Sequence, residues 1–219
     1  MHQVINPKIL YFGTPVVLTS TLNEDGSANL APMSSAWWIG HSCMLGLDAD
    51  SQTLRNLRRE RECVLNLPSS DLGASVNRLA LTTGRNPVPG WKARIGYRFE
   101  PNKFGTALFT EAPSDLVRPP RVAECPVQLE AKVHNIHEFG LDDPRLGPDS
   151  VVAVETHIVR IHIDESLLIP GSPNYIDAEK WKPLIMSFCE FFGLTGKLHP
   201  STLAPAFYGA PKPAEPAAS

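Results

Sequence analysis

The sequence lacks the long apolar runs, the secretory leader and the excess of positive charge that mark several large classes of protein. No segment approaches the roughly 20 consecutive apolar residues that a helix needs to cross a bilayer. The first residues, Met1 to Val4, do not have the charged and then apolar layout of a secretory signal. The formal net charge of −3 provides no basic surface for nucleic acid. We therefore expect a cytoplasmic protein without nucleic-acid or membrane partners.

The motifs of common metal, hydrolase and dinucleotide sites are also missing. The four cysteines, Cys43, Cys63, Cys125 and Cys189, form no C-x-x-C pair, and we expect them to be buried, reduced thiols. No pair of histidines has the spacing and the accompanying carboxylate that would predict a metal site. The chain has neither a G-x-S-x-G elbow nor a G-x-G-x-x-G fingerprint, so standard serine hydrolase and Rossmann dehydrogenase sites are not predicted.

The composition that remains is ordinary for a globular protein, with 42% hydrophobic and 20% charged residues among 219. A chain of this length can form one sizeable barrel core, and we expect a single domain over residues 1–204. Residues 205–219 are rich in proline and alanine and cannot bury enough apolar surface to offset the entropy of ordering. We therefore expect this tail to be disordered.

Short β-branched and apolar runs separated by turns predict a mainly β fold with a few helices. Asp25-Gly26 tolerates the positive φ of a tight turn and predicts a hairpin between the first two runs. The expected strands cover residues 15–21, 27–38, 43–47, 63–67, 128–133 and 151–163.

Two segments have helical periodicity, and a third has little periodicity at all. Leu54 and Leu57 fall on one helix face just after Ser51, which can cap the helix. An apolar stripe over residues 181–192 predicts a helix near the end of the chain. Residues 68–126 are rich in Pro, Gly and Asn, with at most a short helix around Leu72 to Leu81. A connection this long usually covers a site or reaches a partner.

A strand of small and hydroxyl-bearing residues is the first candidate site. Small side chains let a planar ring approach the backbone, whose amides can hydrogen-bond the polar edge of that ring. The alternative is that the proline only marks the edge of a sheet, because proline cannot donate a ladder hydrogen bond. The candidate residues are Asn29, Ala31, Pro32, Met33, Ser34 and Ser35.

The junction between a strand and the first helix is the second candidate site. Free backbone amides and the positive end of the helix dipole make a helix N-terminus an anion site, and hydroxyl side chains add donors. The alternative is that Ser51 only caps the helix. The candidate phosphate-binding residues are Ser51, Gln52, Thr53 and Asn56.

These segments also occur in an informative order. In sequence they are residues 15–21, Asp25-Gly26, Asn29-Leu30-Ala31-Pro32-x-Ser34, Thr53-x-x-Asn56, residues 62–67, Lys103-Phe104, residues 121–130 and His157-Ile158-Val159. This ordered series, over about residues 8–190, resembles the flavin reductase-like, FMN-binding split-barrel family.

The resemblance implies a six-stranded, Greek-key split barrel that forms a homodimer with two identical FMN sites at the subunit interface. Residues 29–35 would then face the isoalloxazine ring, and residues 51–56 would hold the phosphate. Members commonly pass a hydride from NADH or NADPH to the flavin, which then serves an oxygenase or another redox partner. The resemblance thus implies FMN as cofactor and a pyridine nucleotide as co-substrate.

Two further residues, His157 and Gln52, bear on hydride transfer and on phosphate binding. His157 matches a place where relatives often carry a histidine near the nicotinamide, and the resemblance implies a catalytic role for it. The alternative is an ordinary histidine on a strand face. Gln52 stands where many relatives have a lysine, and the missing positive charge predicts weaker binding of the phosphate unless Arg55 or a residue of the partner chain compensates for it.

The leading functional hypothesis is an NAD(P)H-dependent flavin reductase. One alternative is a non-enzymatic flavin-binding module that carries electrons for a protein partner. Another is a split barrel that has lost its cofactor, because function depends on the site rather than on the fold.

Overall fold

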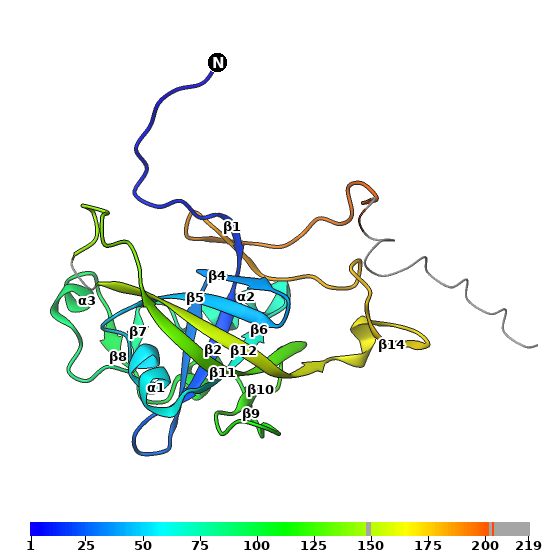
Figure 1. Ribbon diagram of the computed structural model, residues 1–219, viewed down its shortest axis with the longest axis horizontal. Coiled ribbons are helices and arrows are strands. Elements are labelled where there is room, and N and C mark those ends of the chain that lie inside the picture. The colour runs from blue at the N-terminus through cyan, green and yellow to red at the C-terminus, as the bar shows by residue number, and fades with distance from the viewer. Residues whose placement is uncertain (148–149, 202, 204–219) are drawn as a thin grey trace, which may run out of the picture.

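The computed structural model describes residues 1–147, 150–201 and 203, and it is mainly β (Figure 1). A seven-stranded antiparallel sheet curls into a barrel, with strand order β3-β2-β6-β11-β12-β5-β4. This sheet has one strand more than the resemblance implied. Its strands are β2 (Val17–Leu22), β3 (Ala28–Met33), β4 (Ala36–Ile39), β5 (Ser42–Asp48), β6 (Glu62–Leu67), β11 (Val127–Glu138) and β12 (Val151–Ile163).

The barrel has a seam where its two edge strands follow one another in the chain. The single strand predicted over residues 27–38 is wrong, because the chain breaks at Ser34-Ser35. β3 pairs with β2 at one edge of the sheet, whereas β4 pairs with β5 at the other edge. Pro32 therefore does lie on an edge strand, where its missing amide hydrogen costs no ladder bond.

The predicted first helix is confirmed as α1 (Gln52–Glu60), between β5 and β6. Ser51 caps it, since its hydroxyl accepts a hydrogen bond of 3.1 Å from the amide of Leu54. Leu54 and Leu57 are fully buried and close one end of the barrel interior. The helix ends at Arg61, which adopts a left-handed conformation with φ of 60°.

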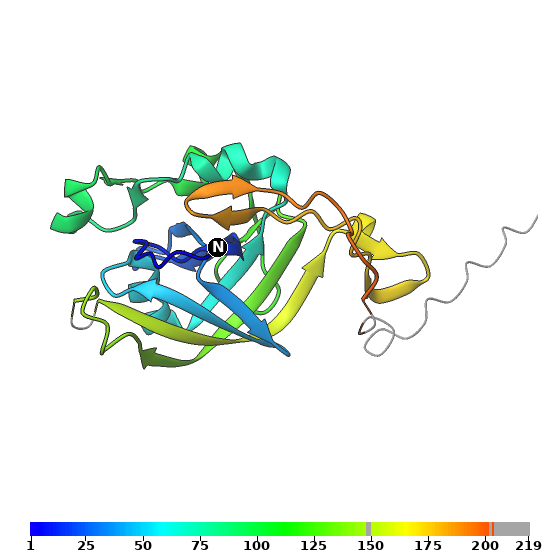
Figure 2. The same cartoon turned by 90° about the horizontal axis from the view of Figure 1, so that it is seen from above.

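The long connection forms a layer of short elements against the barrel, as Figure 2 shows. The predicted short helix is present but ends at Asn77. The elements of this layer are η1 (Ser70–Leu72), α2 (Gly73–Asn77), β7 (Thr82–Thr83), α3 (Gly90–Arg94), β8 (Arg98–Phe99), α4 (Lys103–Ala107), β9 (Glu111–Ala112) and β10 (Arg121–Val122).

Two hydrophobic cores lie on opposite faces of the same strands. On β2, Val17 belongs to the core inside the barrel, and its neighbour Leu18 belongs to the core between the barrel and the covering layer. Val76 and Phe104 from the covering layer complete the second core. Burial of both faces fixes the layer on the barrel, because each buried aliphatic side chain contributes about 1.5–3 kcal/mol.

The helix predicted over residues 181–192 is wrong. This segment forms a hairpin of β15 (Ile185–Ser187) and β16 (Glu190–Phe192), and β15 also pairs with β1 (Phe12–Pro15). The two turn residues, Phe188 and Cys189, have φ values of 47° and 68°. Residues before this hairpin form η2 (Glu165–Leu167), β13 (Leu168–Ile169) and β14 (Ser172–Ile176).

Three of the four cysteines are buried, and one is exposed. Cys43, Cys63 and Cys125 are buried free thiols as predicted, whereas Cys189 is exposed because it lies in the hairpin turn. Burial raises the pKa of the Cys43 thiol to about 12. Within the described residues, no helix has the length and apolar character needed to cross a membrane. The predicted tail, residues 205–219, lies outside the described residues.

Candidate functional site

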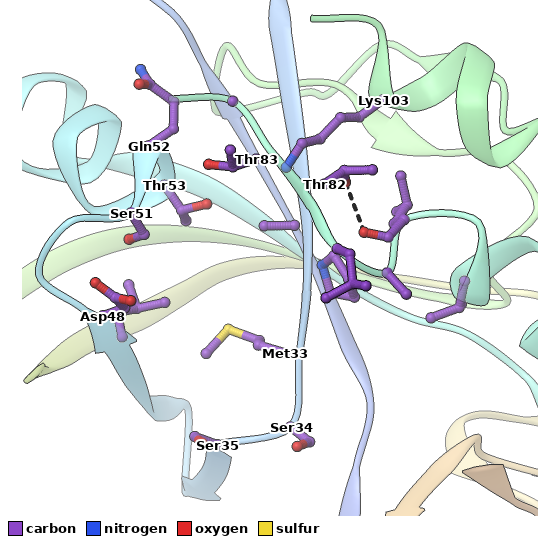
Figure 3. Close-up of a pocket in the computed structure, with 18 of the residues that line it drawn as sticks. Met33, Ser34, Ser35, Asp48, Ser51, Gln52, Thr53, Thr82, Thr83 and Lys103 are labelled. Atoms are coloured by element: carbon purple, nitrogen blue, oxygen red, sulfur yellow. Dashed lines mark hydrogen bonds between the residues drawn. The ribbon is translucent and has the colours of Figure 1, made fainter. Parts of the chain in front are cut away.

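A cavity of about 470 Å³ opens at the barrel seam, between the barrel and the covering layer (Figure 3). This volume lies within the range of pockets that hold small ligands and cofactors. Every candidate cofactor-binding residue except Asn56 lines it, so the two segments predicted from the sequence do share one site. These lining residues are Asn29, Ala31, Pro32, Met33, Ser34, Ser35, Ser51, Gln52 and Thr53.

The serines of the seam form one end of the cavity, and Met33 lies between them and the helix end in Figure 3. The backbone of Ser35 accepts a hydrogen bond of 2.7 Å from the amide of Gly46. A Cβ atom on Gly46 would lie 3.0 Å from the Cβ of Ser35, so a side chain there would push the seam apart. The Tyr11 hydroxyl lies 3.2 Å from the Ser35 hydroxyl. These contacts hold the seam as a shallow surface of small groups.

The N-terminus of α1 forms the opposite end of the cavity. The first amides of a helix have no partner within the helix, and the first turn of α1 contains no acidic side chain. The Ser51 hydroxyl accepts the amide hydrogen of Leu54, so its own hydrogen is left to donate. Ser51 therefore caps the helix and can also bind an anion, which reconciles the two interpretations of this residue.

The buried side-chain amides of Asn29 and Asn56 hold the helix end in place, and of the two only Asn29 also lines the cavity. The Asn29 amide donates to the Thr53 hydroxyl at 3.2 Å, which places Asn29 with the helix end and not with the seam. Asn56 is fully buried and donates to the Thr21 hydroxyl and to Asn23, each at 3.0 Å. It also accepts a bond of 2.9 Å from the Gln52 side chain. Asn56 is thus a positioning residue and does not reach the cavity.

Two buried lysines face the same cavity, and the candidate residues did not include them. Lys92 and Lys103 are only 7% and 4% exposed. The Lys92 ammonium lies 3.3 Å from the carboxylate of Asp48 and over the rings of Trp91 and Tyr97. Lys103 has no ion pair or hydrogen bond with any residue that the structure describes.

The isolation of Lys103 affects its protonation. Burial lowers the pKa of Lys103, the charge of Lys92 lowers it further, and Glu100 only partly opposes them, which leaves the pKa at about 8. Figure 3 shows its side chain extending from α4 into the cavity. An anionic ligand would restore the lost solvation of this ammonium. The sequence contained one signal for it, since Lys103-Phe104 is among the segments that resemble the family.

His157 does not lie in the cavity. Its neighbours Thr156 and Ile158 on β12 are buried, so the alternation of the strand turns the His157 side chain outward, where it is exposed. His157 pairs in register with Lys132 and Ser42 on the adjacent strands. Within one chain, this geometry supports the alternative of an ordinary strand histidine.

A separate cluster of Asp115, Glu130 and His162 has ligand atoms close enough together to hold a metal ion. Ligand atoms of Asp115, Glu130 and His162 lie within 4.8 Å of one another. The buried Glu130 carboxylate already accepts hydrogen bonds from His162 and from the amides of residues 115–117. Burial raises the pKa of Glu130, but these hydrogen bonds outweigh it and lower the pKa. The cluster is therefore explained as an anchor for the loop at residues 115–117.

The chain is similar to several known proteins. It is 40% identical over 190 residues to the uncharacterized protein YdfE of Bacillus subtilis, covering 87% of this chain and 88% of that protein. Its fold is similar to that of flavoredoxin from Desulfovibrio vulgaris, with a TM-score of 0.74, 20% identity and coverage of 93% of this chain and 99% of that one.

A third similarity is to the solved structure of nitrilotriacetate monooxygenase component B from Bacillus cereus. Here the TM-score is 0.70 at 18% identity, with coverage of 91% of this chain and 98% of the other. The fold is a split barrel of the flavin reductase-like kind. The Flavin reductase like domain family matches residues 9–173. Since this match spans most of the chain, the protein belongs to the flavin reductase-like family.

Proposed function

We propose that this protein is an oxidoreductase that holds one FMN in the seam cavity and reduces it with NADH or NADPH. The single observation that carries the proposal is that one cavity contains both the N-terminus of α1 and the buried Lys103 ammonium, which has no partner among the described residues. Both features attract an anion, and the cavity between them and the seam is of cofactor size. A phosphate ester attached to a flat ring system matches these features.

The residues present fit that group. Ser51, Thr53 and the first amides of α1 would hold the phosphate through hydrogen bonds. The seam residues Ser34 and Ser35 would lie against the ring, where small side chains allow close approach to the backbone. Lys103 would face the anionic part of the cofactor from the covering layer.

The protein residues would bind and orient, and the cofactor would supply the redox chemistry. A bound flavin accepts a hydride from a reduced nicotinamide and passes the electrons to an acceptor. The desolvated Lys103 ammonium stabilises negative charge more strongly in this cavity than it would in water, because the local dielectric constant is lower. No proton from His157 is needed for hydride transfer, which agrees with its exposed position.

The test is to purify the protein, extract any bound flavin and identify it by chromatography. The flavin-loaded protein should absorb near ~450 nm, as flavins do, and it should lose this band when NADH or NADPH is added without oxygen. A protein that binds flavin but is not bleached by either nucleotide would contradict the reductase activity. A colourless protein whose melting temperature does not rise with FMN would indicate a barrel that has lost its cofactor.

The second candidate is an electron carrier that exchanges electrons with another protein. One observation favours it: side chains of the covering layer, including Val76, Thr83 and Lys92, line the cavity, so this layer lies over the proposed flavin site. The fold similarity to flavoredoxin agrees with it. The bleaching experiment separates the two candidates, because a carrier would be reduced by its protein partner or by dithionite and not by a pyridine nucleotide.

The proposal includes a homodimer with the flavin near the interface. In support, the rings of Phe12 and Phe188 pack edge to face with 4.7 Å between their centroids, and the two residues are 73% and 43% exposed in the single chain. Trp37 on edge strand β4 is also 54% exposed. Light scattering on the purified protein should give twice the mass of one chain.

The acceptor of the electrons would be an oxygenase or another redox partner.

A further inference from the structure

Residues 72–99 of the covering layer carry positive charge without acidic residues to balance it. This stretch contains no Asp or Glu, although the whole chain has a net charge of −3. Its exposed arginines form no side-chain hydrogen bond or ion pair with any residue in the described part of the chain; they are Arg78, Arg94 and Arg98. Lys92 differs from them, because it is buried and pairs with Asp48. The outer surface of the layer is therefore electropositive on a protein that is negative overall.

Exposed apolar side chains lie beside two of these arginines. Trp91 and Ile95 are four residues apart on α3 and its C-cap, so they share one face, and they are 42% and 56% exposed. Leu81 is 46% exposed, and its backbone oxygen accepts a hydrogen bond of 3.0 Å from the amide of Arg98. Figure 1 shows α3, β7 and β8 together at one end of the molecule. We call this surface the α3 patch, and its residues are Leu81, Trp91, Arg94, Ile95 and Arg98.

The α3 patch has the composition of a protein-binding surface. Exposed apolar side chains that gather among polar ones mark interaction sites, and tryptophan and arginine are enriched at the centres of protein interfaces. A second copy of the chain that met this patch with its own would place arginine against arginine, which is unfavourable. A partner with carboxylates would instead pair with both guanidinium groups, since arginine binds carboxylates through two parallel hydrogen bonds.

The α3 patch also adjoins the proposed flavin site. The centroid of the Trp91 ring lies 5.1 Å from the ammonium of Lys92, and Lys92 lines the seam cavity. Tyr97, which precedes Arg98, lines the cavity as well. The same short segment thus has the patch on its outer side and the cavity on its inner side. A protein bound to the patch would lie close to the flavin.

We propose that the α3 patch docks an electron-transfer protein that carries carboxylates around its redox centre. The two arginines would pair with those carboxylates, and Trp91 and Ile95 would pack on an apolar area between them. One reduced flavin holds two electrons, so it reduces two one-electron acceptors and releases its protons to water. This inference rests on the proposed function for the source of the electrons, whereas the docking itself does not require a bound flavin.

The experiment uses two haem proteins of opposite surface charge as model partners. Cytochrome b5 has carboxylates around its exposed haem edge, and cytochrome c has lysines there. Surface plasmon resonance measures the binding of the flavin-free full-length protein to each of them. The protein should prefer cytochrome b5, although its own net charge of −3 would favour cytochrome c. A rise in ionic strength from about 0.01 M to about 0.15 M shortens the Debye length from about 30 Å to about 8 Å and should weaken this binding.

Arg94→Gln and Arg98→Gln should each weaken the binding of cytochrome b5 about 2- to 5-fold, and Ile95→Ser about 5-fold or more. None of these residues lines the seam cavity, so FMN affinity and melting temperature should stay unchanged in each variant. Arg58→Gln on α1 and Ile176→Ser on β14 are matched controls at exposed positions outside the patch, and both should bind like the wild-type protein. When the flavin-loaded protein is reduced with dithionite, the three patch variants should reduce cytochrome b5 more slowly by similar factors.

A preference for cytochrome c, or equal binding of cytochrome b5 by the wild-type protein and all three variants, would overturn the inference and leave the proposed function standing. Binding of cytochrome b5 without its reduction by the reduced protein would do the same. A protein that binds no flavin would overturn both, because the electrons would have no source. A change from dimer to monomer in Arg94→Gln would assign the patch to the subunit interface. Binding to phosphatidylserine vesicles but not to cytochrome b5 would assign it to a membrane surface, and either assignment also overturns the inference.

Discussion

The ammonium of Lys92 lies 3.3 Å from the carboxylate of Asp48, and this ion pair crosses the seam cavity from helix α3 to the end of strand β5. It joins the covering layer to the barrel. The Lys92 side chain is 8% exposed and that of Asp48 is 28% exposed, so the lysine depends on this carboxylate for most of its stabilisation. The pair also neutralises one of the two lysines in the cavity.

Replacement of Asp48 by asparagine should therefore have two opposite effects. The buried Lys92 would lose its counter-ion, and the free energy of unfolding should fall by about 1–3 kcal/mol, less than for a fully buried pair because Asp48 is partly exposed. The affinity for FMN should rise, because a second ammonium becomes available to the ligand. Urea unfolding and flavin titration measure the two effects. Asp142→Asn, at an exposed position that does not line the seam cavity, is the control and should change neither.

The protonation of Lys103 predicts a pH dependence of cofactor binding. Its pKa in the free protein is about 8, and an anionic ligand favours the charged form and raises this pKa. FMN affinity should therefore be highest below pH 8 and should fall as the pH rises through and above this value. Titrations of the flavin-free protein between about pH 6.5 and 9.5, roughly 1.5 units either side of the pKa of about 8, measure the effect.

Lys103→Met tests whether this residue is responsible. Methionine keeps the length of the side chain and removes the charge, so FMN affinity near pH 7 should fall about 10- to 100-fold, and the pH dependence should flatten. The folded pKa of Lys103 lies below the unfolded value of 10.5, so the unfolded chain binds more protons between about pH 8 and 10.5. The stability of the wild-type protein should accordingly rise over that window, and that of the variant should not. Equal pH profiles for both proteins would contradict the assignment.

Gln52→Lys tests the departure of the helix end from the family pattern. A lysine next to the proposed phosphate would replace a neutral hydrogen bond by a charged one, which is worth about 0.5–2 kcal/mol more. FMN affinity should rise about 3- to 30-fold, and riboflavin affinity should not, because riboflavin has no phosphate. Gln52→Met is the control, since it also loses the bond to Asn56 but adds no charge.

The sequence predicted the parts of the site that depend on local patterns. The cap at Ser51 and the leucine spacing of α1 are local, and the structure confirms both. The small residues of the seam are also recognisable in the sequence. The two cavity lysines are different, because nothing local distinguishes Lys92 from an ordinary surface lysine in a loop. Their burial results from packing of the covering layer on the barrel, which is a long-range property.

The two wrong predictions of secondary structure have physical causes. The run at residues 27–38 looks continuous, but its two halves are the opposite edge strands of the sheet, since β3 pairs with β2 and β4 pairs with β5. This division depends on how the whole sheet closes into a barrel, which is not visible in the local sequence. The apolar stripe at residues 181–192 matches a helix because a short hairpin with apolar residues on both faces has no clear period of two. Its turn also lacks the glycine or asparagine that marks such turns.

That turn leads to a last prediction. Phe188 and Cys189 both adopt positive φ between Ser187 and Glu190, which pair across the hairpin, and this geometry favours glycine at the second position. Cys189→Gly should raise the free energy of unfolding by about 0.5–1 kcal/mol, because the left-handed strain at Cys189 exceeds the entropy that glycine adds to the unfolded chain. Cys189→Ala removes the thiol and keeps the Cβ atom, so it should leave stability nearly unchanged. Thermal unfolding of the two variants should separate them by about 1–4 °C, and an alanine variant as stable as the glycine variant would show that the turn is not strained.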